Sequence, residues 1–511
     1  MVFSSITFLF LFLPAVIVIY HLVFFLPITL GSRRPIWWRL SNLFLLLTSL
    51  LFYYWGEKSK VWIFVITTFL DYLSALVISR AVFTSRFENL RPHEPRAGWQ
   101  RVVLIVSIGS NLALLAYFKY FNFGVDTYNS VVEFMGLTSW HWNNVKSVAM
   151  PLGISFFTFH SMSYTIDVYH GRARATRNFI DYACYVLMFP QLVAGPIVRY
   201  SYVATSLTSR LVTSRYFASG VVRFILGLSK KVLVANTVAV AADKIFALPT
   251  AVLTPDVAWL GIAAYTLQIY FDFSGYSDIA VGLGRMFGFE LPQNFNYPYS
   301  ATSIRDFWRR WHISLSTWLQ DYVYIPLGGS HGSKRRTALN LLLVFFLCGL
   351  WHGAKWTFVV WGLYHGLFLM LERHPAFSTW LKRAGSLGHL YTMLVVMGGW
   401  VLFRADTFGQ AASFFSSLAG AHLGPSPYSA RWFVTPDVAI AMIAGIVFST
   451  PILHSSAVWL DHFVSQRNPR ATRRIVPAFA CVRVAALTLM VVLCSMSLAT
   501  GTHNPFIYFR F

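Results

Sequence analysis

The most regular feature of the sequence is a series of apolar runs separated by short polar connections. Many runs approach the roughly 20 residues that an α-helix needs to cross a bilayer. Because some runs would be half-helices, we expect about 10–13 membrane segments, re-entrant helices included. No internal repeat or soluble domain stands out, so the pattern predicts an all-α polytopic membrane protein with one integral domain, residues 1–511. The expected spans lie near 3–30, 40–56, 60–80, 101–122, 148–168, 180–198, 219–245, 258–284, 338–351, 355–372, 389–404, 437–452 and 476–498.

Residues 300–327 depart from this pattern because charged residues interrupt the apolar positions. Ser303, with Asp306 three residues later, predicts a helix start. At helical spacing one face would carry the large apolar side chains Trp308, Trp311, Leu315, Trp318, Leu319 and Tyr322. Another face would carry Arg305, Arg309, His312 and Ser316. Charges make a lipid-exposed span costly, so we expect this helix to re-enter the protein or to lie at the interface as a plain amphipathic helix.

Composition agrees with membrane integration. Hydrophobic residues make up 56% of the chain and charged residues only 12%, against about 25% charged residues in ordinary globular domains. The net charge of +22 would suit a nucleic-acid ligand, but the basic residues sit in short loops between apolar runs. Topology and anionic lipid headgroups explain such a distribution better, although part of the charge could attract an anionic donor.

The basic residues also alternate between successive loops. Three loops of one parity contain Arg33, Arg34 and Arg39, then Arg80, Arg86, Arg91, Arg96 and Arg101, then Arg172, Arg174 and Arg177. The loops between them hold Lys58, Lys60 and Lys146. The positive-inside rule then places the basic loops in the cytoplasm and the N-terminus outside it. The apolar run that begins at Phe3 lacks a basic leader and a cleavage site, so we interpret it as a first span.

The four cysteines lie within apolar runs and show no metal-ligand spacing or disulfide framework. We therefore expect Cys184, Cys348, Cys481 and Cys494 to fill the core. No G-x-S-x-G elbow, P-loop or H-E-x-x-H motif occurs, and no histidine has an aspartate five positions later. These absences weigh against a serine hydrolase, an ATPase and a metalloenzyme.

His352 is the first candidate for chemistry. It follows the apolar run 338–350 in the motif LWHGAKW. A histidine at membrane depth is a functional hypothesis, because hydrocarbon makes unsatisfied polar groups expensive. Burial favours the neutral imidazole, which can accept a proton. A histidine hydrogen-bonded across helices as structural glue fits the same pattern.

Two further histidines have weaker signals. His365 lies 13 residues beyond His352, which would put it on a different face of one straight helix. Either the helix breaks near Gly353, or His365 packs against Trp361 one turn earlier. His312 lies among arginines and suits a second polar residue lining a cavity. Asp272 and Tyr276 lie within or at the edge of an apolar run, where polar groups pair internally or line a water-filled path in an enzyme or a carrier.

Several ordered motifs resemble the membrane-bound O-acyltransferase (MBOAT) family, and within it the bacterial branch that acetylates polysaccharides such as alginate. The resemblance extends over about 150–410, whereas the flanking regions fit in hydropathy and carry little signature apart from the ending FIYFRF. Its motifs are PLGISFFTFHSMSYTIDVYHG (151–171), FPQLVAGPIVRY (189–200), QIYFDFSGYSDIAVGLGRMFGF (268–289), NFNYPYSATSIRDFWRRWHISLSTWLQDYVYIPLGG (294–329), GLWHGAKWTFVVWGLYHG (349–366) and WVLFRADTF (400–408).

The resemblance implies a ring of helices around a central funnel. The family's invariant histidine falls on His352 and its second, frequently essential polar residue on His312. A thioester donor such as acetyl-CoA would approach from the cytoplasm of a bacterium. The acceptor hydroxyl of a polysaccharide would wait outside the inner membrane, reached directly or through a periplasmic transferase. No metal or bound cofactor is implied.

Six further residues are candidates for binding donor or substrate. Arg305 and Arg309 could hold the donor's phosphates, although they fit equally as interface anchors. The others are Asp306, Trp351, Asp272 and Tyr276. Alternatives remain: D-alanyl, lipid or protein acyl transfer within the family, a transporter of acyl donors or glycans, or a scaffold subunit in an export complex. Inverted repeats would favour a transporter, and none is visible.

Overall fold

The computed structural model describes residues 3–29, 36–80, 90–92, 94–193, 195–210, 212–421, 426–452 and 469–501. The ending FIYFRF and the basic residues Arg33, Arg34 and Arg86 lie outside these ranges. Within them, every regular element is a helix, as the apolar pattern predicts. The chain forms two compact units, one comprising Met1–Val221 with Ala280–Pro292 and the other Val222–Ile279 with Gln293–Phe511.

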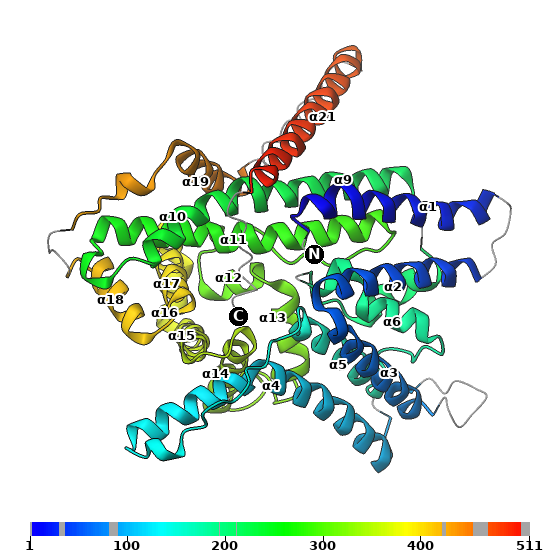
Figure 1. The fold of residues 1–511 in the computed structure, drawn as a ribbon, viewed down its shortest axis with the longest axis horizontal. Coiled ribbons are helices and arrows are strands. Elements are labelled where there is room, and N and C mark those ends of the chain that lie inside the picture. The colour runs from blue at the N-terminus through cyan, green and yellow to red at the C-terminus, as the bar shows by residue number, and fades with distance from the viewer. Residues whose placement is uncertain are drawn as a thin grey trace. The chain divides into compact units, whose positions relative to one another are not determined.

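The first unit is built mainly from the N-terminal helices (Figure 1). Within it α2 packs against α6, and α5 packs against both α3 and α4. Its elements are η1 (Phe8–Phe12), α1 (Leu13–Thr29), α2 (Ile36–Glu57), η2 (Lys58–Lys60), α3 (Val61–Ile78), α4 (Gly98–Phe134), η3 (Thr138–Trp140), α5 (Ile154–Tyr169), α6 (Phe179–Leu187), α7 (Phe189–Leu192), α8 (Tyr200–Thr208) and the beginning of α9 (Ser214–Ser229).

The second unit contains the predicted site residues. Helix α11 (Pro255–Met286) begins in this unit, and its residues from Ala280 onward belong to the first unit. The remaining elements are η4 (Lys230–Ala235), α10 (Asn236–Phe246), η5 (Thr250–Val252), η6 (Pro298–Ser300), α12 (Ile304–Arg310), α13 (Ile313–Leu319), η7 (Gln320–Tyr324), α14 (Lys334–His352), α15 (Trp356–Glu372), α16 (Pro375–Arg383), α17 (Ser386–Arg404), α18 (Phe408–Leu418), η8 (Ala430–Phe433), α19 (Pro436–Phe448) and α21 (Pro469–Ala499).

The helices follow the expected spans closely. Five helical stretches of the described chain are long and apolar enough to cross a membrane: 37–78, 98–134, 214–246, 386–404 and 477–499. Helix extends beyond the expected spans at two places, because α4 runs on to Phe134 and α18 occupies residues 408–418. The four cysteines are free, and three are buried. The expected core position of Cys481 was wrong, since its side chain is exposed on α21.

Buried polar side chains in the first unit bond to one another, as a low-dielectric interior requires. Asp71 of α3 accepts hydrogen bonds from Ser107 Oγ at 2.7 Å and Asn111 Nδ2 at 2.9 Å, both on α4. Asn42 of α2 bonds Asp181 at 2.6 Å and accepts from the buried Arg210 at 2.6 Å. These groups tie neighbouring apolar helices together at defined positions.

The segment 300–327 is not the single helix that its spacing suggested. Ser303 does cap α12, accepting a hydrogen bond from the Asp306 amide at 3.0 Å. The helix then stops at Trp311, and His312 adopts a left-handed backbone with φ of 45° before α13 begins. Side-chain spacing cannot reveal such a break, because both halves keep helical periodicity. His312 therefore lies at a corner, not on a shared face with Arg305 and Arg309.

The contact between α14 and α15 is the most extensive between two helices of the described chain (Figure 1). Two glycines permit it. A Cβ atom on Gly362 would collide with the carbonyl oxygen of Phe345, and one on Gly349 would collide with that of Phe358. Small residues allow helix backbones to approach closely in membranes. The two helices are therefore held at backbone contact.

We expect Gly362→Ala to force α14 and α15 apart and to lower the melting temperature of the purified protein. The predicted loss is about 1–3 kcal/mol, the usual cost of overpacking a well-packed core. Gly109→Ala on α4 is the matched control, because its Cβ would meet nothing within 4 Å and alanine favours a helix. Equal melting temperatures for Gly362→Ala and wild type would contradict the tight contact.

Candidate functional site

His352 is the last residue of α14 and is only 4% exposed. The chain turns at Gly353, where a Cβ atom would collide with the Phe358 ring, and α15 starts at Trp356. His352 thus lies at the turn of a tight helical hairpin, and the break expected near Gly353 is confirmed.

The imidazole faces a small cavity within the second unit. The cavity holds about 10 Å³, close to the space that a single water molecule needs. Its lining is aromatic and apolar apart from the histidine: Ile269, Phe273, Trp311, His352, Trp361, Trp400 and Phe403. The Trp361 ring lies 4.9 Å from the imidazole and the Phe403 ring 5.5 Å, both edge-on. Apolar walls keep water away from a base, so a reacting group must enter by moving these side chains.

His312 lies beside His352 although 40 residues of sequence separate them. Their ring centroids are 6.3 Å apart, and His312 is fully buried. The Trp351 ring contacts both, at 5.8 Å from His312 and 4.9 Å from His352. The structure therefore brings His352, His312 and Trp351 close together, three residues that the sequence analysis proposed separately as site residues.

Asn294 fixes the corner at which His312 sits. Its side-chain oxygen lies 3.2 Å from His312 Nδ1 and accepts hydrogen bonds from the amide and hydroxyl of Ser314 at 3.1 and 2.9 Å. The Ile313 amide donates to the Asn294 carbonyl at 2.9 Å. This network offsets the cost of the left-handed backbone at His312, which is unusual for a residue other than glycine.

Arg305 and Arg309 line a second, larger cavity of about 310 Å³ in the same unit. Both side chains come from α12 and are exposed. The remaining lining is largely apolar and includes Leu315, Val344 and Cys348. A cavity with cationic groups and an apolar body suits a ligand that has anionic and apolar parts.

Two tryptophans stand between the cavities. Trp308 lines the arginine cavity and Trp361 lines the His352 cavity, with their ring centroids 5.9 Å apart. Cys348 of the arginine cavity lies one helical turn before His352 on α14. A ligand in the arginine cavity would therefore have its nearest route to His352 past an indole pair.

The remaining candidates lie elsewhere. Asp306 accepts hydrogen bonds from Arg310 Nε at 3.0 Å. Asp272 pairs with the buried Lys231 of η4 at 2.6 Å, and the Tyr276 ring lies 5.8 Å from the same ammonium group. Among the described lining residues of the two cavities, none of these three side chains appears. The ion pair with Lys231 agrees with internal pairing, one of the two possibilities for Asp272, whereas its role in substrate binding stays a prediction.

Sequence reasoning overlooked two positioning residues, Asn294 and Glu372. Glu372 ends α15 and is buried, and its carboxylate accepts hydrogen bonds from the amides of Ile304 and Arg305 at 2.5 and 2.9 Å. It therefore caps the first turn of α12, where negative charge is favourable. The sequence did carry a signal for this role, because Glu372 is an acidic residue at the end of an otherwise apolar run.

His365 proves to be a packing histidine. It is fully buried and lies 5.3 Å from both Trp361 and Trp308, measured between ring centroids. It is not among the lining residues described for either cavity. Its predicted contact with Trp361 is confirmed.

The comparisons with known proteins agree with one another. The family model described as MBOAT, membrane-bound O-acyltransferase family, matches residues 152–403. The chain is 38% identical to a probable alginate O-acetylase of Pseudomonas putida, with both chains covered completely. It is 43% identical to the same protein of Pseudomonas aeruginosa over 82% of this chain and 75% of the relative. A peptidoglycan O-acetyltransferase of Helicobacter pylori is 34% identical over 82% of this chain and 80% of the relative.

We expect Glu372→Ala to release the first turn of α12 and to destabilise the protein by about 1–3 kcal/mol, the cost of leaving buried amides without acceptors. Glu372→Gln keeps one acceptor oxygen and should lose less. Thermal unfolding of the two purified variants measures the difference. Equal melting temperatures for Glu372→Ala and wild type would show that the contact does not hold α12.

Proposed function

Because this chain belongs to the membrane-bound O-acyltransferase family, we propose that it carries an acetyl group from a cytoplasmic thioester, acetyl-CoA being the expected donor, to hydroxyls of an extracytoplasmic polysaccharide. O-Acyl transfer is the activity of the family and of its named relatives. The observation that carries the proposal for the site is the close approach of two buried imidazoles: His352 lines an aromatic cavity, and the ring centroid of His312 lies 6.3 Å from that of His352.

His352 would act as the general base. It would take the proton from the acceptor hydroxyl as that oxygen attacks the thioester carbonyl. The carbon–sulfur bond then breaks, the acyl group stays on the oxygen, and the proton passes to the departing thiolate. Proton transfer supplies about 10²–10⁴-fold in rate, and positioning supplies much of the rest. The neutral imidazole is the form that this role needs.

His312 would assist from its position beside His352, where Asn294 holds it. A second imidazole can orient the hydroxyl or stabilise the developing oxyanion. Trp351 contacts both rings and would keep them at a fixed separation. Asp272 and Tyr276 would act indirectly, by joining α11 to η4 through Lys231, and Asp306 would support α12.

Arg305 and Arg309 would bind the donor's phosphates at the arginine cavity. Guanidinium groups recognise phosphates through charge-assisted hydrogen bonds. The apolar body of the cavity would then receive the donor's less polar arm, on the route past Trp308 towards His352.

The membrane location, topology and partner of this chain are inferences from its sequence and its relatives. We infer that residues 1–511 work as one integral domain in the bacterial inner membrane, with the N-terminus in the periplasm and the basic loops in the cytoplasm. A periplasmic acetyltransferase is the expected partner where transfer is relayed. The transporter and scaffold alternatives lose support, because the named relatives are transferases that share most or all of this chain.

We expect His352→Ala to insert and fold normally while removing at least about 99% of the acetyl groups from the exported polymer, since the base is lost. The O-acetyl content of the polymer measures this. His365→Gln is the matched control, a buried histidine outside the cavity linings, and should retain most acetylation. Normal acetylation of the polymer by the His352→Ala variant would contradict a catalytic role for His352.

Arg305→Ala should raise the donor KM by about tenfold while leaving turnover at saturating donor unchanged, the signature of lost ground-state binding. Radiolabelled acetyl-CoA and membrane vesicles provide the assay. Arg335→Ala, an exposed arginine at the start of α14 outside the arginine cavity, is the control. A fall in saturated turnover with unchanged KM would argue against donor binding by Arg305.

A further inference from the structure

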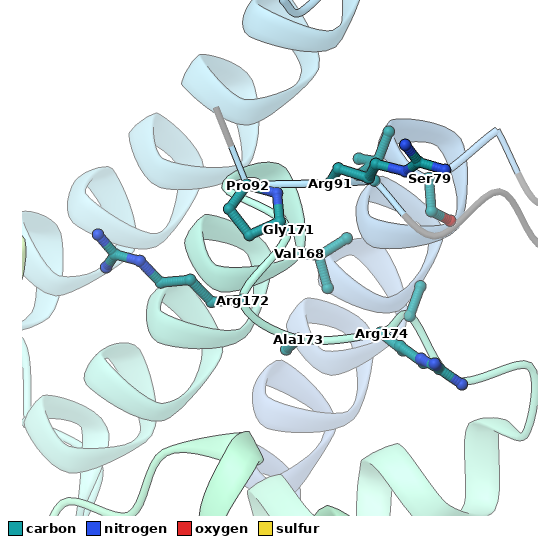
Figure 2. Close-up of a pocket in the computed structure, with 10 residues that line it drawn as sticks. Ser79, Arg91, Pro92, Val168, Gly171, Arg172, Ala173 and Arg174 are labelled. Atoms are coloured by element: carbon teal, nitrogen blue, oxygen red, sulfur yellow. The ribbon is translucent and has the colours of Figure 1, made fainter. Parts of the chain in front are cut away.

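A third cavity lies in the first unit and shares no lining residue with the two cavities described above (Figure 2). It holds about 280 Å³. Its walls are the residue after α3 (Ser79), the segment 90–92 and the turn that follows α5 (Gly171–Ala175), with Val168 from the last turn of α5.

The cavity has firmly held walls. Gly171 has φ of 71°, and a Cβ atom there would collide with the Leu90 carbonyl oxygen, so the turn and the segment 90–92 touch through their backbones. Arg96 joins the same two pieces, donating to the Tyr169 carbonyl at 2.6 Å and to the Arg91 carbonyl at 2.8 Å. Its side chain is only 8% exposed. The Arg172 amide closes the turn on the Asp167 carbonyl at 2.8 Å.

The lining is strongly cationic. Of the ten described lining residues, three are arginines and none is acidic. Figure 2 shows Arg91 and Arg174 on one side of the turn and Arg172 on the other. Glu94, the acid of the stretch 90–96, is engaged within that stretch, accepting from the Arg91 amide at 3.1 Å and lying 3.6 Å from Arg96. Within the described ranges, no ion pair neutralises Arg91, Arg172 or Arg174.

The cavity also lies where two apolar stretches end and begin. Two stretches long and apolar enough to span a membrane end and begin beside it, 37–78 just before Ser79 and 98–134 just after the segment 90–96. Trp99, at the start of the second stretch, is exposed, and tryptophan is enriched at membrane interfaces. Helices that span a membrane end near the lipid phosphates, and anionic lipids are enriched on the cytoplasmic side, where the basic loops are expected to lie.

We propose that this cavity is a binding site for a phosphate-ester anion, with the exposed guanidinium groups of the lining residues Arg91 and Arg174 as cationic ligands. Planar guanidinium groups are the preferred partners of phosphate oxygens. The backbone contacts between the walls form a concave site before any ligand binds. Positive charge that served only to set membrane topology would not need such a site. The ligand is either a lipid headgroup or a soluble phosphate compound.

Native mass spectrometry of the purified full-length protein tests whether the cavity binds such an anion. The probes are 1-palmitoyl-2-oleoyl phosphatidylglycerol, the matching phosphatidylcholine and inorganic phosphate. Wild type should retain phosphatidylglycerol over phosphatidylcholine if the ligand is a lipid. Phosphate that binds without any lipid preference would assign the site to a soluble anion. The double variant Arg91→Gln/Arg174→Gln should weaken retention by about tenfold or more, given the contribution of each surface arginine.

Variants at two further positions, Ala173 and Arg101, also test the site. Ala173→Glu places a carboxylate in the lining and should abolish anion binding, whereas the isosteric Ala173→Gln should preserve it. Arg101→Gln removes an exposed charge of the same loop region outside the cavity and should bind like wild type. Wild-type binding by both the double variant and Ala173→Glu, or an equal loss in Arg101→Gln, would overturn the proposal. Binding is measured without acetyl transfer, so its failure leaves the proposed function untouched.

Discussion

The backbone contact between α14 and α15 fixes the position of His352. Gly349 and Gly362 bring the two helices closer than any side chain would allow, and the chain turns at Gly353 directly after the histidine. A residue at such a turn has little freedom, so its ring can be held edge-on against Trp361 and Phe403. Preorganisation of this kind lets a single base act without reorganising its surroundings at each turnover.

The second histidine depends on a different device. His312 sits at a left-handed corner between α12 and α13, and such corners persist only where neighbouring groups over-determine them. Asn294 and the Glu372 carboxylate supply that constraint from outside the segment, one bonding the start of α13 and the other the first turn of α12. The corner turns His312 towards His352 while α12 presents Arg305 and Arg309 to a separate cavity. One break in a helix therefore separates the expected chemical centre from the expected donor site.

Particular residues show how far sequence reasoning reaches. The apolar runs predict helix positions well, because lipid requires each span to satisfy its own backbone hydrogen bonds. Ser303 as a cap and His365 as a packing residue follow from local spacing. The prediction of a single helix through 300–327 was wrong, since the hydrogen bonds that hold its corner come from Asn294, 18 residues before His312. The partner of Asp272 was also invisible, because Lys231 belongs to another helix.

Sequence alone determined that the chain is an all-helical membrane protein, where most of its helices lie and which motifs relate it to acyltransferases, because hydropathy and short motifs are properties of contiguous residues. Tertiary structure alone decided that His312 lies beside His352, that Arg305 and Arg309 line a cavity separate from that of His352, and that Asp306, Asp272 and Tyr276 are absent from the described linings of both cavities. Those outcomes depend on how closely helices distant in sequence approach and on where a buried carboxylate or amide finds its partner, and no local pattern encodes either.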